Sequence, residues 1–444
     1  MKTLHFTNSW HATSGGIATF YRALMDAANR RGHEMVLVVP GVEEKTESVG
    51  AYGRIHYVAA PLAPMNGGYR MMFPGKYITR SSRLRQILNE ERPDIIEVCD
   101  KYTLNYFAGM LRTGMLGDVS CRPITVALTC ERMDDNVRAY LGWSGLAAPL
   151  VQFYMKWLYF SFFDAHIANS AYTAEELRNA SAGHTIRRGV WVRPMGVDFH
   201  GLSPAHKSAQ ARKDLLKKVG APHEATSLLL YVGRLAREKN LALLLDTLSV
   251  LRQRDNRDWR LVLVGDGAER ASLLKQANRR TQGAVAWLGH MRDRAELGRI
   301  YANSDAFVHP NPREPFGIAP LEAMASGLPL VAPDRGGVTT YANSGNAWVV
   351  SPDAGSFADA VESIVSDPSS RTCKTAEALC TAAQFRWENA AGSFLNLYED
   401  LFRTAQGEPC RIPADFLSTA PPSGNGSPVA RFTAGVFQRL LATR

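Results

Sequence analysis

The feature that most constrains the fold is an alternation of short apolar runs with helical patterns. The first run covers residues 3–6, a glycine-bearing loop follows, and residues 17–32 then have apolar positions at helical spacing. A strand, a glycine-bearing loop, a helix and another strand form the repeat of a doubly wound parallel sheet. In such sheets ligands bind beyond the carboxyl ends of the strands, where a helix N-terminus offers free N–H groups.

The alternation breaks once and then restarts, which predicts two sheets. It stops at residues 193–204, and a polar, lysine-rich stretch follows. We expect strands over residues 3–6, 33–40, 55–60, 94–100, 123–130 and 165–170, and then over 227–235, 259–267, 284–290, 305–310, 328–333 and 347–352. A long helix is expected over 387–405. The fold class is therefore α/β, with two doubly wound Rossmann-like domains.

Net charge and cysteine spacing limit the kinds of partner that we expect this protein to bind. The net charge of +9 and the pI of 9.3 favour an anionic partner, which could be a nucleotide, a phospholipid surface or a nucleic acid. A generally basic soluble protein is the alternative. No recognition motif for nucleic acid accompanies the charge, so we expect no nucleic-acid partner. None of the six cysteines lies in a C-x-x-C pair or at zinc-binding spacing, and the apolar or helical surroundings of most of them favour free thiols in a reducing compartment.

The most apolar run, residues 146–163, contains Gln152 and Lys156 near its middle. A charge at the centre of a bilayer is costly, so we expect a buried or half-buried helix here, with a helix at a membrane interface as the alternative. The N-terminus has no long apolar segment, so no signal peptide is expected.

Charged residues follow two strands of the second half. Arg234 and Lys239 come after the strand expected at 227–235, where two cations and exposed N–H groups suit a diphosphate. Taken alone, these residues are better explained as two solvated surface charges. Gly265 and Gly267 allow a tight turn, and a plain structural turn is the default interpretation there.

Residues 309–322 place two carboxylates around a turn. Proline and glycine fix an exposed loop over 309–317, from which Glu314 projects. The next helix begins at Ile318 and Ala319, whose N–H groups are available to phosphate. Glu322 lies one turn further on, and its two acceptor oxygens suit the hydroxyls of a ribose. These residues together predict a site for a nucleotide-sugar.

At this point the chain resembles a known family. The sequence E-P-F-G-I-A-P-L-E over 314–322 is similar to the E-x7-E signature of retaining GT-B glycosyltransferases of family 4. The resemblance extends to S-G-G at 14–16, M-G-V-D at 195–198, G-R-L-x-x-E-K at 233–239 and V-G-D-G at 264–267. It implies the GT-B fold, in which two Rossmann-like domains face each other across a cleft.

The resemblance also implies domain boundaries. The first domain would cover 1–197, and the segment 386–405 would return to it, because F-R-W-E at 385–388 looks like the family's crossover. The second, nucleotide-sugar-binding domain would cover 198–385. Composition, rather than the resemblance, predicts a flexible tail over 406–444 with a short basic amphipathic segment. This segment would contact a membrane surface or a partner, or else fold back on the body or fray.

The family's functional residues carry over to matching positions. Arg234 and Lys239 would neutralise the diphosphate leaving group, and Glu314, with the backbone amides of Phe316 and Gly317, would hold the donor sugar. No metal or other cofactor is implied, and no D-x-D occurs in the sequence. The implied mechanism is front-face transfer with retention, in which fixed cations stabilise the departing phosphate.

Two glycines and the second glutamate complete the implied donor site. Glu322 would bind the ribose, and Gly15 and Gly16 would let the first loop approach the phosphates. Two positions depart from the family pattern. Cys130 stands where many members have a histidine near the donor sugar, and Glu131 is an alternative for that role. Thr340 stands where some members have a glutamate.

The acceptor is less determined than the donor. Segments 96–104 and 129–135 look most like bacterial members that move mannose or related hexoses onto lipid acceptors. We therefore expect a hexose to pass from GDP-mannose or a UDP-hexose to a lipid or glycan acceptor. The protein would be cytoplasmic and peripheral on the inner face of the membrane. A catalytically weak nucleotide-sugar-binding protein and a sugar-nucleotide epimerase are the alternatives.

The basic, aromatic segment 67–86 is the candidate for contact with anionic headgroups. Its cations would meet the headgroups while its aromatic and methionine side chains enter the interface. A solvated helix face with an apolar underside is the alternative.

Overall fold

The computed structural model describes residues 1–10, 15–63, 69–117, 119–141, 147–181, 189–221 and 223–415. The chain divides into two compact units. Unit 1 comprises Met1–Asp134, Trp143–Arg193 and Gly392–Arg444, and unit 2 comprises Asp135–Gly142 and Pro194–Ala391. Most of the tail expected over 406–444 lies outside the described residues, because the description ends at Asp415.

Unit 1 contains an eight-stranded sheet in the order β3-β4-β2-β1-β5-β6-β7-β8. The strands are β1 (Lys2–Thr7), β2 (Glu34–Gly41), β3 (Lys45–Val49), β4 (Gly53–Ala59), β5 (Ile95–Cys99), β6 (Ile124–Thr129), β7 (Ala165–Ala168) and β8 (Val190–Val192). All neighbours pair in parallel except β3 and β4. The order reverses between β1 and β5, so the carboxyl ends of these two strands form the switch point at which such sheets bind ligands.

The six strands expected in this half are present as β1, β2, β4, β5, β6 and β7. Their apolar runs are buried on both faces, which is typical of a parallel sheet covered by helices. The sequence did not predict β3 or β8. Strand β3 reads KTESV and lies exposed at the sheet edge, so it lacks the apolar run that identified the others.

Helices cover this sheet. They are α1 (Gly16–Arg31), α2 (Arg83–Glu91), α3 (Asn105–Arg112), α5 (Ala147–Phe153) and α6 (Ala171–Ser181). Helix α4 (Met133–Leu141) begins in unit 1, but its residues from Asp135 onward belong to unit 2. Helix α1 buries Phe20, Tyr21 and Leu24 on one face, as its helical spacing predicts. Gly32 ends this helix in the left-handed conformation, with φ of 69°.

The apolar run at 146–163 is more divided than the single helix we expected. Helix α5 is followed by a π-helical segment (Tyr154–Tyr159) and a 3₁₀ turn (Phe160–Phe162). The second half is buried at Tyr159 and Phe160, whereas Leu150 and Phe153 of α5 are 67% and 51% exposed. Among the residues described, no helix combines the length and apolarity that crossing a membrane requires.

The described part of the segment expected to meet headgroups, residues 69–86, does not present all of its cationic and apolar side chains at the surface, and residues 67 and 68 lie outside the described residues. Met72 and Tyr77 are fully buried, and Arg85 is 5% exposed. The Arg85 guanidinium donates to the carbonyl oxygens of Ile78 and Leu116. Part of the segment therefore packs inside unit 1, because its apolar residues fill the core and Arg85 satisfies buried backbone acceptors.

Unit 2 contains a six-stranded sheet in the order β11-β10-β9-β12-β13-β14. Its strands are β9 (Ser227–Val232), β10 (Trp259–Val264), β11 (Val285–Trp287), β12 (Ala306–Val308), β13 (Leu330–Pro333) and β14 (Trp348–Val350). All six were expected, and every pairing is parallel. The strand order reverses between β9 and β12, which places a second switch point at the carboxyl ends of these strands.

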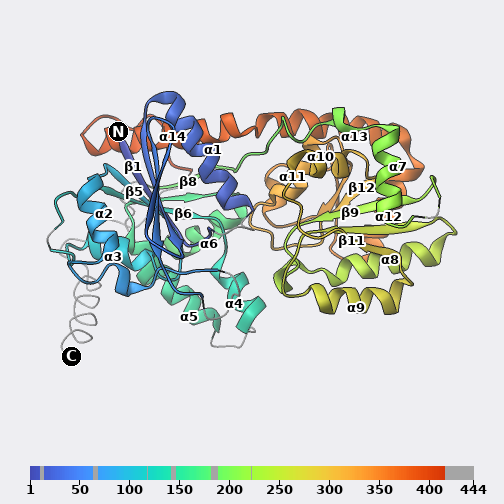
Figure 1. Cartoon of the computed structure of the whole chain (residues 1–444), viewed down its shortest axis with the longest axis horizontal. Helices are drawn as coiled ribbons and strands as arrows, with labels where there is room; N and C mark the ends of the chain where they lie inside the picture. Colours follow the sequence, from blue (N-terminus) through green and yellow to red (C-terminus); the bar gives the residue numbers. More distant parts are fainter. Residues whose placement is uncertain are drawn as a thin grey trace. The chain divides into compact units, whose positions relative to one another are not determined.

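The helices of unit 2 lie on both sides of its sheet, with α8 and α9 on one side and α10 and α11 on the other (Figure 1). They are α7 (Ala209–Lys218), α8 (Ala242–Arg254), α9 (Arg270–Thr281), α10 (Arg294–Ala302), α11 (Ile318–Ala325), α12 (Ala354–Ser366) and α13 (Pro368–Gln384). Leucines of α8 and the aromatic residues Trp259 and Phe357 dominate the core on the first side.

Helix α14 (Trp387–Ala405) has the bounds that the sequence predicted. Its first residues belong to unit 2 and the rest, from Gly392, belong to unit 1. The predicted apolar stripe is buried, with Phe394, Leu397 and Tyr398 at 0% exposure. In unit 1 the Tyr398 hydroxyl donates to Glu97, a fully buried carboxylate of β5.

Candidate active site

The loop after β9 begins the candidate site in unit 2. Gly233 leaves the strand, and a 3₁₀ turn over Arg237–Lys239 leads to α8. Arg234 donates to Glu238 at 2.7 Å, and its side chain is 44% exposed. Asn240 follows in the left-handed region, with φ of 54°, and its amide donates to the Pro310 carbonyl oxygen at 2.9 Å. This contact ties the loop after β9 to the loop after β12.

Gly265 and Gly267 support that loop. A Cβ on Gly265 would lie 2.0 Å from the Gly233 carbonyl oxygen, and one on Gly267 would lie 2.3 Å from that of Leu235. The two loops therefore run in backbone contact, which requires glycine. The default interpretation, a structural turn, accounts for this G-x-G.

Lys239 and Glu314 form the central contact of the site. The Lys239 ammonium lies 2.9 Å from Oε1 and 2.8 Å from Oε2 of Glu314, and both side chains are mostly buried. Asn311 donates to the same carboxylate at 3.1 Å. Burial alone would raise the pKa of Glu314, but the Lys239 ammonium, His309 and these hydrogen bonds outweigh it and lower the pKa to about 2. Glu314 is thus a fixed anion at neutral pH.

His309 lies at the end of β12 and is 4% exposed. Burial lowers its pKa to about 4, so the imidazole is neutral at physiological pH. No described residue bonds to its Nε2 atom. His309 lies within the loop expected over 309–317, where the sequence pattern indicates no role for it.

The loop from Arg335 to Thr340 packs against the Glu314 segment. The N–H of Gly337 donates to the Glu314 carbonyl oxygen at 2.6 Å, and a Cβ on Gly337 would lie 1.9 Å from the Pro315 carbonyl oxygen. Only glycine fits this approach. Thr340, which departs from the family pattern, ends the short turn that begins at Gly337.

Gly317 connects this loop to α11. It precedes the helix with φ of 83° and ψ of 79°, a left-handed conformation that suits glycine. The Tyr341 hydroxyl donates to its carbonyl oxygen, and the Phe316 and Tyr341 rings pack edge to face at 5.3 Å. Among the residues described, none accepts a hydrogen bond from the N–H groups of Gly317, Ile318 or Ala319. The start of α11 therefore presents donors to a ligand.

Glu322 lies further along α11 and is 8% exposed. Arg294 donates to its Oε1 at 3.0 Å, and the Tyr301 hydroxyl donates to its Oε2 at 2.9 Å. Both partners come from α10, and Arg294 also pairs with Asp198 at 3.6 Å. Sequence reasoning did not identify Arg294 or Tyr301, because neither stands in a recognisable motif.

The remaining predicted residues belong to unit 1. Gly15 precedes α1 and Gly16 is its first residue, and a Cβ on Gly15 would meet nothing within 4 Å. Cys130 and Glu131 follow β6, on the loop that leads into α4. Burial, with Cys99, Glu97 and Glu131 nearby, raises the pKa of the Cys130 thiol well above its usual value. Cys130 is therefore a neutral thiol.

The structure thus brings some predicted residues into direct contact and leaves others apart. Lys239 and Glu314 meet, whereas Arg234 pairs with Glu238 and Glu322 pairs with residues of α10. The unpartnered N–H groups at the start of α11 lie between Glu314 and Glu322 in the chain.

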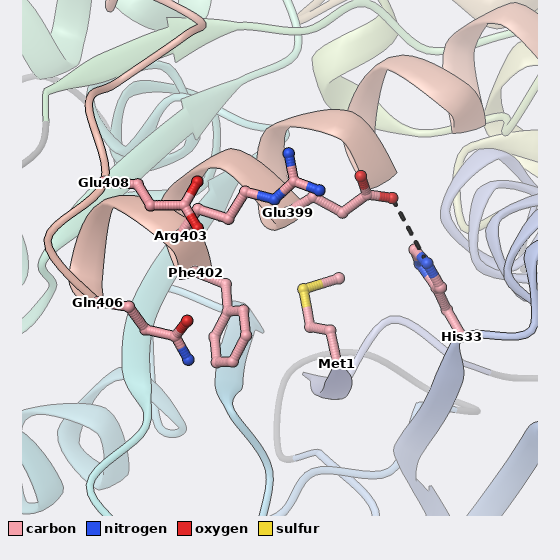
Figure 2. A pocket seen from close by; sticks show the side chains of 7 residues that line it. All are labelled: Met1, His33, Glu399, Phe402, Arg403, Gln406 and Glu408. Carbon is pink, nitrogen blue, oxygen red and sulfur yellow. Dashed lines mark ion pairs between the residues drawn. The ribbon is translucent and has the colours of Figure 1, made fainter.

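A pocket of about 320 Å³ is present elsewhere, in unit 1 (Figure 2). Its lining residues are Met1, His33, Glu399, Phe402, Arg403, Gln406 and Glu408. His33 and Glu399 form an ion pair across it at 3.5 Å. It involves the amino ends of β1 and β2 and the end of α14, and none of the residues predicted from the sequence lines it.

Comparison with known proteins identifies the family. Residues 14–222 match the model of Glycosyltransferase Family 4, and residues 212–383 match that of Glycosyl transferases group 1. The chain is 29% identical over 400 residues to a GDP-mannose-dependent alpha-(1-6)-phosphatidylinositol dimannoside mannosyltransferase of Mycobacterium tuberculosis, covering 89% of this chain and 95% of the relative. A GDP-mannose-dependent alpha-mannosyltransferase of Corynebacterium glutamicum is 26% identical, covering 94% and 92%.

Solved structures share the fold. Sucrose-phosphate synthase from Thermosynechococcus elongatus matches with a TM-score of 0.70 and 20% identity, over 91% of this chain and 100% of that one. HepE of Anabaena, solved with UDP and glucose, matches with a TM-score of 0.64 and 18% identity, over 90% and 99%. The prediction of two Rossmann-like sheets in a GT-B fold is confirmed. The chain is an enzyme of glycosyltransferase family 4.

Proposed function

We propose that this enzyme transfers mannose from GDP-mannose to a lipid acceptor, with retention of the anomeric configuration. The observation that carries the proposal is the Lys239–Glu314 pair, which lies at a switch point beside the unpartnered N–H groups that begin α11. Two relatives that span almost the whole chain are named as GDP-mannose-dependent mannosyltransferases, which supports this donor.

The diphosphate would bind between cations and the start of α11. Lys239 uses two of its three N–H donors on Glu314, so one donor remains for a phosphate oxygen. Arg234 is half-exposed and would exchange its contact with Glu238 for the phosphate. The N–H groups of Ile318 and Ala319 add the positive end of a helix. The resemblance to family 4 implies that Gly15 and Gly16 also contribute to phosphate binding.

The two glutamates would hold the two sugars. Glu314, with the amides of Phe316 and Gly317, would accept hydrogen bonds from the mannose hydroxyls as a permanently ionised carboxylate. Glu322 has about four acceptor sites, of which Arg294 and Tyr301 occupy two. The two remaining sites match the two hydroxyls of a ribose.

The reaction itself would depend on charge stabilisation. Negative charge grows on the departing phosphate as the sugar becomes oxocarbenium-like, and fixed cations aimed at that phosphate favour the transition state over the ground state. We propose that Arg234 and Lys239 take this role without a divalent metal. Glu314 and Glu322 would then bind substrate rather than act as a paired acid and base.

A lipid acceptor requires access to a membrane surface. Helix α5 exposes Leu150 and Phe153, and Lys156 follows in the next turn with its ammonium 5.2 Å from the Trp157 ring centre. Apolar side chains beside a cation suit the interface of an anionic bilayer, and the net charge of +9 has the matching sign. We propose that α5 contacts the inner leaflet. The phosphatidylinositol dimannoside in the name of one relative supports such an acceptor.

Transfer from radiolabelled GDP-mannose to a bacterial lipid extract tests this function, with UDP-glucose and UDP-galactose as competing donors. We expect mannosylated lipid from GDP-mannose, in buffer containing EDTA as well as without it. Glu314→Gln and Lys239→Met should both abolish transfer. Normal transfer by both variants would defeat the assignment, and a preference for a UDP-sugar would correct the donor. Co-sedimentation with anionic and neutral vesicles tests the proposed membrane contact of α5. It compares the wild-type protein with a double variant that carries Leu150→Ser and Phe153→Ser.

A further inference from the structure

Lys101 is the charged residue that most needs an explanation. It lies two residues after β5, at the switch point of the unit 1 sheet, and is only 1% exposed. Lysine is almost never fully buried unless it is paired, because removing its charge from water costs several kcal/mol. Lys101 lies within the segment 96–104, where the sequence pattern indicates no role for it.

The Lys101 ammonium has two anionic or polar partners. It lies 2.5 Å from Oε2 of Glu176, itself 6% exposed, and it donates to the carbonyl oxygen of Glu131 at 2.6 Å. Its third neighbour is the Tyr159 ring, whose centre is 5.5 Å away. The Lys101 side chain therefore holds the loop after β6 through a hydrogen bond to the backbone of that loop.

Glu176 holds the same loop from the other end. Its Oε1 atom accepts hydrogen bonds from the N–H groups of Met133 at 2.8 Å and Asp134 at 3.2 Å. These are the first residues of α4, where a carboxylate is favoured by the helix dipole. Lys101 and Glu176 thus fix the backbone on both sides of Arg132.

The π-helical segment braces this arrangement. Its hydrogen bonds run from residue i to residue i+5, so residues five apart lie on a similar face. Tyr154 and Tyr159 are five apart, and both reach the site. The Tyr154 hydroxyl donates to the Lys101 carbonyl oxygen, and the Tyr159 hydroxyl lies 3.1 Å from Oγ1 of Thr129. Such segments are often found at functional sites.

We propose that Lys101 and Glu176 are positioning residues of the transferase, which hold the loop carrying Cys130 and Glu131 in its reactive conformation. The inference rests on the proposed function, because the resemblance to family 4 implies that the position of Cys130 contributes to binding of the donor sugar. A buried ion pair seldom adds net stability. The Lys101–Glu176 pair is therefore better explained by the loop conformation that it fixes than by a gain in the free energy of unfolding. Displacing a reacting or contacting group by about 1 Å can cost on the order of 100-fold in rate.

Three variants separate positioning from folding. Lys101→Met and Glu176→Gln each disrupt the pair. The double variant removes both charges. In it, as in Glu176→Gln alone, the side-chain amide keeps an oxygen that can accept from the N–H groups of α4. We expect each single variant to lower kcat by roughly 30-fold or more, with GDP affinity unchanged, because the nucleotide would bind unit 2. The double variant should recover part of the lost rate, since it leaves no unpaired buried charge.

The control is Lys45→Met, which removes an exposed lysine of β3 that pairs with Glu47. It should change neither kcat nor GDP affinity. Hydrogen exchange of the 129–134 peptide should accelerate in the single variants and not in the control.

The possible results are distinct. If kcat stays within threefold in both single variants, or if kcat, GDP affinity and unfolding temperature all fall together, the positioning role is wrong. If the wild-type protein transfers no sugar from any nucleotide, the proposed function fails before the variants are compared, and this inference fails with it.

Discussion

The ammonium of Lys239 lies within 2.9 Å of both carboxylate oxygens of Glu314, so the main candidate cation and the main candidate anion of the donor site neutralise each other. This contact has a consequence for binding. A diphosphate meets a lysine with one free N–H rather than three, and the remaining attraction comes from Arg234 and the start of α11. Glu314 in turn keeps its charge because Lys239 is beside it.

Lys239→Met should therefore affect both partners. The variant leaves Glu314 mostly buried without its cation, which should raise its pKa above the present value of about 2. We expect a loss on the order of 2 kcal/mol in the free energy of unfolding, since both side chains retain some exposure. Binding of GDP, measured by calorimetry, should weaken at least tenfold.

The matched control is Lys213→Met, at an exposed lysine of the same unit that pairs with Glu224 at 3.5 Å. Exposed pairs contribute little, so stability should change by less than about 0.5 kcal/mol. Equal effects of the two substitutions would show that the Lys239–Glu314 pair contributes no more to stability and GDP binding than an exposed ion pair does.

Tyr301→Phe tests how Glu322 is held. The substitution removes one buried hydrogen bond to a carboxylate and keeps the ring, which is fully buried. Hydrogen bonds to charged groups contribute about 1.5–3 kcal/mol, so unfolding should become easier by about that amount. GDP should bind roughly five- to tenfold more weakly, while 2′-deoxy-GDP loses less. Tyr52→Phe, at an exposed tyrosine, is the control. Equal losses for both nucleotides would contradict a role for Glu322 at the ribose.

Much of this architecture was readable from the sequence because parallel sheets bury both faces of each strand. All twelve expected strands are present, and α14 has its predicted bounds. Strand β3 was missed because it is polar and exposed, and its place in the sheet depends on pairing with β4 rather than on its own residues. The division of 146–163 was missed because apolar periodicity does not distinguish a π-helical segment from an α-helix.

The site was only partly readable, for a similar reason. Glu314 and Glu322 stand in a local pattern of proline, glycine and helix formers. The partners of Glu322, Arg294 and Tyr301, come from α10 and are brought close only by the folding of the unit. Nor did the pattern indicate that Lys239 would already be paired with Glu314. Contacts between distant segments carry no local signal.

Acidification should destabilise the protein in two successive windows. His309 has a pKa of about 4 against an ordinary 6.5, so the unfolded chain takes up a proton first, and stability falls as the pH drops from 6.5 to 4. Over this range the loss amounts to roughly 3 kcal/mol. The stability that Glu314 contributes is fully present above pH 4.5 and is lost as the pH falls towards 2.

Urea unfolding between pH 7.5 and 4.5 measures the first window. His309→Gln should flatten the dependence in that range, whatever it does to absolute stability. His166, whose pKa burial lowers to about 3, contributes the same sign in unit 1 and remains in the variant. An unchanged slope in the variant would mean that His309 is not the buried neutral histidine described above.

Gly337→Ala should disrupt the site through sterics alone. The added Cβ would lie 1.9 Å from the Pro315 carbonyl oxygen, so the Glu314 segment must shift. We expect a cost of about 1–3 kcal/mol in stability and a large loss of GDP affinity. Gly355→Ala, in α12, is the control, because its nearest contact would be an ordinary 3.4 Å and alanine favours the helix. If the Gly337→Ala variant bound GDP with full affinity, this loop would not be part of the donor site.

Cys130 should behave as an inert thiol despite its position. Burial, with Cys99 and two nearby carboxylates, holds its pKa well above the usual range, and reactivity requires the thiolate. Iodoacetamide at pH 8 should therefore label the exposed Cys373 and Cys380 first and leave Cys130 unmodified, as mass spectrometry of the peptides would record. Cys130→Ala should leave the pH profile of transfer unchanged between pH 6 and 8.5. The contrary result would be rapid labelling of Cys130 with a parallel loss of activity, seen in a Cys373→Ser variant as well. It would identify Cys130 as a reactive thiolate.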